Sequence, residues 1–153
     1  MTGRAELTLS ASDHDKAFTE VCFLLDIFVS AIGDVVNKSG SALGLAAGRH
    51  MGKKLPVFLA EPTLASVLEA VAGRLASGFV IDSRCDGSGA DVEIARCAIR
   101  DVCAKRNIAV GGEMCRMFHY YLAGIATELL GGRAVRATEA KAGDRCTFRL
   151  ETR

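Results

Sequence analysis

The sequence predicts an α+β domain, with N-terminal helices followed by an antiparallel four-stranded sheet that a long helix interrupts. In the first half of the chain, apolar residues recur at steps of three and four, which is the period of a helical face. After Gly78, and again after Gly132, this period changes to the alternation of strands. A helical stretch separates the two alternating regions, so the expected order is α-α-α-β-β-α-β-β.

Length and composition indicate one domain. The chain has 153 residues, half of them hydrophobic, and a net charge of +1, which suits a single domain with a real core. We divide it into a flexible N-terminal arm, residues 1–12, and one α+β domain, residues 13–153. Lys and Arg do not cluster, so no nucleic-acid partner is expected. Without a membrane-spanning run or a signal-peptide segment, we expect a cytoplasmic protein.

The first predicted helix carries one continuous apolar face. Ser12 or Asp13 is the expected cap, and residues 37–40 end the helix. The apolar positions between these limits follow helical steps over about five turns. They are Phe18, Val21, Cys22, Leu25, Phe28, Val29, Ile32, Val35 and Val36.

The second predicted helix, residues 41–55, has glycines at every fourth position: Gly44, Gly48 and Gly52. Each glycine costs about 1 kcal/mol relative to alanine inside a helix, so the bare face needs a physical reason. Close packing against another helix is one interpretation. A ligand, or a second copy across a dimer axis, is the other.

The remaining elements are predicted from the period of the apolar residues and from the glycine, proline and turn residues that begin or end each element. The motif 61–63 begins a third helix that Gly78 ends, and residues 86–89 form the turn of a hairpin. The predicted ranges are 64–77 for the third helix, 79–85 and 90–97 for the hairpin strands, 100–108 for a short helical turn or loop, 112–130 for the last helix, and 133–141 and 145–151 for the closing strands.

Several short motifs, in this order along the chain, resemble the 4-vinyl reductase domain family, also called predicted hydrocarbon-binding proteins. That family shares its fold with TRAPP-type vesicle-tethering subunits. The matching positions are 47–52, Cys97, Cys115, 121–124, 129–132, Glu139 and 143–148. The resemblance implies a TRAPP-subunit-like fold and a module that binds a hydrophobic or aromatic small molecule.

The resemblance also implies a zinc site. Metal-binding relatives use a cysteine at the start of the last helix, a glutamate ending the next strand, and two cysteines around the final turn. Cys115, Glu139 and Cys146 match, but no cysteine occupies the first turn position. Because structural zinc normally has four protein ligands, another residue would have to replace the missing cysteine as the fourth ligand. His119, four residues after Cys115, is one candidate, and Cys97 or Cys103 is another. The alternatives are buried structural thiols and a redox-sensing cysteine pair.

For the small-molecule site, we expect the second and last helices to supply the walls, with Gly48, His50, Met51, Phe118 and Tyr121 as the contact residues. Soft Met and aromatic side chains suit an apolar site. Helix packing is the competing explanation for these residues. If Arg84 or Arg96 points inward, it would suit a carboxylate on the ligand.

The leading hypothesis is a ligand-binding or sensing module that acts as a homodimer, with no catalytic residues. A reductase or carrier acting on a tetrapyrrole vinyl group is the enzyme alternative, although the sequence shows neither a dinucleotide loop nor a flavin motif. The third possibility is a TRAPP-like protein-interaction module. The reductase alternative would require a bound redox cofactor, and otherwise zinc is the one cofactor considered.

Overall fold

A computed structural model of the chain describes residues 10–36 and 40–153. It is α+β, as predicted, and the predicted element order is confirmed, with one further helix before the long one. The elements are α1 (Ala11–Val36), α2 (Gly40–Lys54), α3 (Leu64–Leu75), β1 (Phe79–Cys85), β2 (Gly89–Cys97), α4 (Ala98–Arg106), α5 (Glu113–Leu129), β3 (Val135–Lys141) and β4 (Cys146–Thr152). Most of the predicted arm, residues 1–9, and most of the predicted end of the first helix, residues 37–39, lie outside the described residues.

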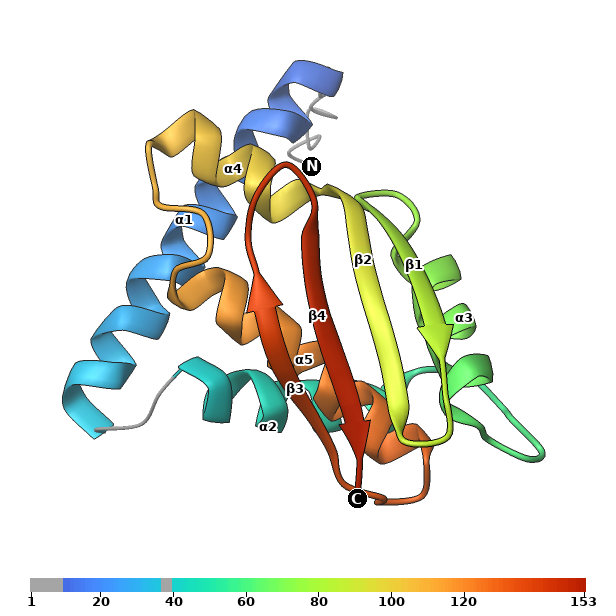
Figure 1. The fold of residues 1–153 in the computed structure, drawn as a ribbon. Helices are drawn as coiled ribbons and strands as arrows, with labels where there is room; N and C mark the ends of the chain where they lie inside the picture. Colours follow the sequence, from blue (N-terminus) through green and yellow to red (C-terminus); the bar gives the residue numbers. More distant parts are fainter. Residues whose placement is uncertain (1–9, 37–39) are drawn as a thin grey trace, which may run out of the picture.

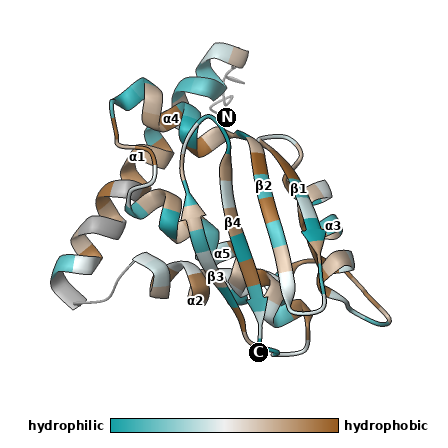
Figure 2. Cartoon of the chain, in the orientation of Figure 1, coloured by the Kyte–Doolittle hydropathy of each residue, from teal (hydrophilic) through white to brown (hydrophobic). Residues whose placement is uncertain are grey.

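The four strands form one antiparallel sheet in the order β1-β2-β4-β3. Helices α2, α3 and α5 lie on one face, and the other face is open, toward the viewer in Figure 1. Figure 2 shows the hydrophobic segments of the strands interleaved with hydrophilic ones. This alternation follows from one buried and one exposed face. None of the described helices is long and apolar enough to span a bilayer.

The core lies between the sheet and the helices α3 and α5. Alternate residues of β4, and of β2 as far as Ile94, point inward, including Val92, Phe148 and Leu150, each at most 3% exposed. The helical side contributes three apolar residues of α3 and a longer series from α5. These are Val67, Leu68, Val71, Phe118, Leu122, Ala123, Ile125 and Ala126.

The glycine face of α2 packs directly on α5. A Cβ atom at Gly48 would lie 2.1 Å from the Tyr121 carbonyl oxygen and 2.9 Å from the Gly124 Cα. A Cβ at Gly44 would lie 2.1 Å from the Met117 carbonyl oxygen. The two backbones therefore approach too closely for any side chain, and close helix packing accounts for the glycine spacing.

The helix starts differ slightly from those predicted. Ser10, rather than Ser12 or Asp13, caps α1: its Oγ accepts from the Asp13 N–H at 3.2 Å, and the Asp13 carboxylate accepts from the Ser10 N–H at 2.9 Å. This reciprocal pair is a capping box. Thr63 caps α3 in the same way with Ser66, so Pro62 precedes the helix.

A β-bulge explains why the second strand does not alternate cleanly in sequence. The β1–β2 register shifts between Val80 and Ile81, which leaves Ala95 as an extra residue in β2. Before the bulge, Ile94 points into the core; after it, Arg96 is exposed and Cys97 is buried. The extra residue reverses the inward and outward positions.

The predicted apolar face of the first helix is largely exposed. Cys22 is buried, but Phe18, Val21, Leu25, Phe28 and Ile32 are between 36% and 55% exposed. Helix α1 stands beside the rest of the domain, next to α4 (Figure 1). The described part of the chain does not cover its apolar face.

Candidate functional site

A groove of about 550 Å³ runs between α1, the end of α3 and the start of α4. We call it the α1–α4 groove. Its apolar lining comes from four elements and includes Phe18, Leu75, Phe79, Ala98 and Val102. A mostly apolar concavity of this size is typical of a small-molecule site.

An aromatic stack connects the groove to the core. The ring of Phe79 in the lining stacks on Phe118 with centroids 4.6 Å apart, and Phe118 stacks on Tyr121 at 6.2 Å. Phe118 is buried, so it supports Phe79 from the core side. The groove therefore has an aromatic wall held by core packing.

Charged residues also line the α1–α4 groove. Lys105 and Asp15 form an ion pair at 2.6 Å. Arg74, Arg96 and Asp101 contribute to the lining as well, and neither arginine forms an ion pair with another described residue. The groove therefore offers an apolar surface and cationic groups, which together suit an apolar ligand with one polar or anionic group.

Beside the groove, the junction of β2 and α4 brings cysteines together. Cys97 ends β2 and interacts electrostatically with Cys146, at the start of β4, and with Cys115, in the first turn of α5. All three thiols are buried, and burial raises the pKa of the Cys97 thiol. A buried thiol with a raised pKa stays protonated and is a poor nucleophile.

Arg100 closes this end of the sheet. It donates a hydrogen bond to the Ala95 carbonyl at the bulge (2.9 Å) and another to the Gly143 carbonyl in the β3–β4 turn (3.2 Å). Arg100 therefore links the bulge in β2, next to Cys97, to the β3–β4 turn, next to Cys146. Both thiols belong to the main hydrophobic core cluster.

His119 lies one turn after Cys115 and is 4% exposed. Its ring stacks on Phe148 at 4.4 Å, and its Nδ1 has no hydrogen-bond partner among the described residues. Burial lowers the His119 pKa to about 4, so the imidazole is neutral at physiological pH and has a free ring nitrogen.

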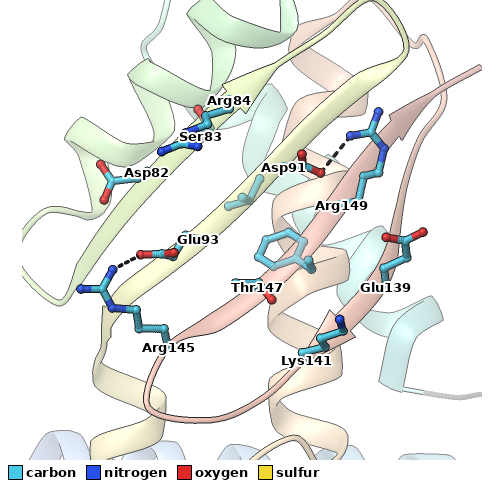
Figure 3. Close-up of a pocket in the computed structure, with 12 residues that line it drawn as sticks. Asp82, Ser83, Arg84, Asp91, Glu93, Glu139, Lys141, Arg145, Thr147 and Arg149 are labelled. Atoms are coloured by element: carbon cyan, nitrogen blue, oxygen red, sulfur yellow. Dashed lines mark hydrogen bonds and ion pairs between the residues drawn. The ribbon is translucent and has the colours of Figure 1, made fainter.

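Glu139 is exposed and separate from these thiols. It lies at a second bulge, in β3, with a φ of 53°, and lines a polar groove of about 740 Å³ on the open face of the sheet. Figure 3 shows it on this face with Lys141 and Arg149. Within the described residues, no group of three or more His, Cys, Asp and Glu side chains is arranged to hold a metal ion. The zinc ligand set that the resemblance implies is therefore not assembled, and zinc stays a prediction.

The open-face groove is a surface of paired charges. Arg149 bonds the carboxylates of Asp91 (2.9 Å) and Asp86 (2.7 Å), which raises the pKa of Arg149 and lowers that of Asp86. Arg145 pairs with Glu93 across neighbouring strands. Arg84 is exposed on this sheet and does not point inward. Within each pair, the arginine and the carboxylate neutralise each other, as expected for a solvated sheet face.

The residues predicted for the small-molecule site fall into two groups. Phe118 and Tyr121 belong to the aromatic stack behind the α1–α4 groove. Gly48 is buried between α2 and α5, whereas His50 and Met51 are exposed on α2. None of the three lines the α1–α4 groove. Sequence reasoning missed Phe79 and Val102, since both have the ordinary pattern of core residues.

Comparison of the chain with protein-family models, curated proteins and solved structures gives no match.

Proposed function

We propose that this chain is a binding or sensing module for a hydrophobic or aromatic small molecule, held in the α1–α4 groove. The observation that carries the proposal is the groove itself, with its apolar lining and its Phe79–Phe118 stack. Aromatic ligands gain from offset stacking on such a wall in addition to burial of their surface. Binding requires no catalytic group.

A ligand of this kind would have one polar end. The apolar part would lie against Phe79, Leu75 and Val102, and the polar part would face Arg74 or Arg96. A guanidinium group binds carboxylates in a bidentate manner. The family resemblance, a proposal in its own right, implies the same broad ligand class.

The proposal can be tested with a soluble aromatic probe, 2-naphthol, followed by amide chemical shifts. We expect saturable shifts at residues 75–79 and 96–102. Ser77→Trp places a large side chain in the groove lining and should abolish them. Arg84→Trp, on the polar open face opposite Asp91, is the matched control and should leave them unchanged. Absence of saturable shifts in the wild type, or shifts that Ser77→Trp does not alter, would contradict the proposal.

A further inference from the structure

Helix α1 presents a continuous apolar stripe to solvent. The exposed residues at positions 18, 21, 25, 28 and 32 follow alternating steps of three and four, the spacing by which helices pack against one another. Leu24 widens the stripe, being three residues after Val21 and four before Phe28, and is about half exposed. In Figure 2, hydrophobic colour recurs along the coloured part of α1.

The opposite side of α1 fixes this orientation. Cys22 packs with Val102 and Met114. Two ion pairs, Asp15 with Lys105 and Glu20 with Arg106, join α1 to α4. The side of α1 that belongs to the domain is therefore defined by both apolar and charged contacts, and the stripe is its other side.

The exposed apolar area is large for a monomer. The six large side chains of the stripe, at about half exposure, present roughly 550 Å². That lies in the upper range for the largest apolar patch of a typical monomer and approaches the roughly 800 Å² that each partner contributes to a standard interface. A contact surface is the physical explanation for an area of this size.

We propose that a second copy of this chain covers the stripe, with the two α1 helices antiparallel about a two-fold axis near Leu25. Phe18 and Ile32 lie seven residues on either side of Leu25, so each would meet the other across the axis. Val21, four residues before Leu25, and Phe28, three residues after it, would pack in the same contact with an offset of one residue. This nearly symmetric spacing lets the stripe pack against a second copy of itself, as an isologous interface requires.

The charges of α1 favour a second copy over a membrane surface. The exposed ionised residues of the helix include Asp13, Asp15, Glu20 and Asp34 against one lysine, Lys16. Helices that lie on anionic bilayers carry Lys and Arg beside their apolar face. An uncharged stripe on an acidic helix suits a partner with the same uncharged stripe. Phe18 also lines the α1–α4 groove, so the two sites share this residue, whereas Val21, Leu25, Phe28 and Ile32 do not line the groove.

Sedimentation velocity of the full chain, from low micromolar to sub-millimolar concentration, tests the proposal. We expect the wild type to sediment as a dimer in the upper part of this range. Leu25→Arg places two buried charges near the axis and should weaken dimerisation by at least about a hundredfold. Phe58→Arg is the matched control, because Phe58 is 92% exposed and lies outside α1; it should dimerise like the wild type.

Circular dichroism separates loss of the dimer from loss of the fold. Leu25→Arg should keep the wild-type helical spectrum because Leu25 does not pack in the domain core. A wild type that remains monomeric throughout would overturn the proposal, as would a folded Leu25→Arg variant that dimerises like the wild type. A monomer that floats with anionic vesicles would overturn it in favour of a membrane surface.

Discussion

His119 makes the stability of the domain depend on pH. Its pKa is lowered to about 4 because burial disfavours the imidazolium ion. In the unfolded chain the same group titrates near pH 6.5, so between these values the unfolded state binds more protons. The titration of His119 therefore has no effect on stability above about pH 6.5 and destabilises the fold increasingly as pH falls toward 4.

His119→Leu should remove this dependence. From pH 8 to pH 5 we expect the wild type to lose about 2 kcal/mol of unfolding free energy more than the variant does. Urea denaturation at both pH values measures the difference. Leucine also replaces an unpartnered buried nitrogen with an apolar group, so the variant should be at least as stable at pH 8. Parallel pH profiles for the two proteins would show that His119 is accessible to water in the folded state.

At the scale of elements, the contact between α2 and α5 depends on the absence of a side chain at Gly48. Gly48→Ala would place a Cβ 2.1 Å from the Tyr121 carbonyl oxygen, which forces the two helices apart. We expect a loss of about 2 kcal/mol or more, as overpacking commonly causes. Thermal or chemical denaturation measures it.

Gly73 provides the matched control within α3. A Cβ there would meet nothing within 4 Å, so Gly73→Ala should stabilise the protein by about 0.5–1 kcal/mol through higher helix propensity. Equal effects at the two positions would mean that helix propensity, rather than helix contact, governs the α2 glycines.

The elements themselves could be predicted because their causes are local. The turn residues 86–89 and 142–144 define both hairpins, since each interrupts an alternating pattern. The bulge at Ala95 could not be located, although the mixed faces of 91–98 indicated an irregularity. A bulge depends on pairing with β1, and the sequence of β2 alone does not specify that register. The same limit applies to Cys97, which is turned inward by the bulge.

At the scale of the whole molecule, the α1–α4 groove arises from segments distant in sequence. Phe18, Leu75 and Val102 come from three helices, and each has the ordinary pattern of an apolar helical position. Periodicity identifies an apolar face but does not specify what covers it. For this reason the face of α1 could be predicted from sequence, whereas its exposure could not, and the predicted ligand site was placed between α2 and α5.

The attachment of α1 also predicts how the molecule should fluctuate. Helix α1 joins the domain chiefly through the ion pairs and the Cys22 contact described above, whereas α5 is buried over most of its length. Local opening costs less where buried contacts are few. We therefore expect amides of residues 24–36 to exchange hydrogen rapidly in dilute protein and at least about tenfold more slowly once the dimer forms. The exchange rates of α5 amides should not depend on protein concentration. In the Leu25→Arg variant, the exchange rates of α1 amides should not depend on it either. Equal protection of residues 24–36 at all concentrations would mean that contacts within one chain hold this helix.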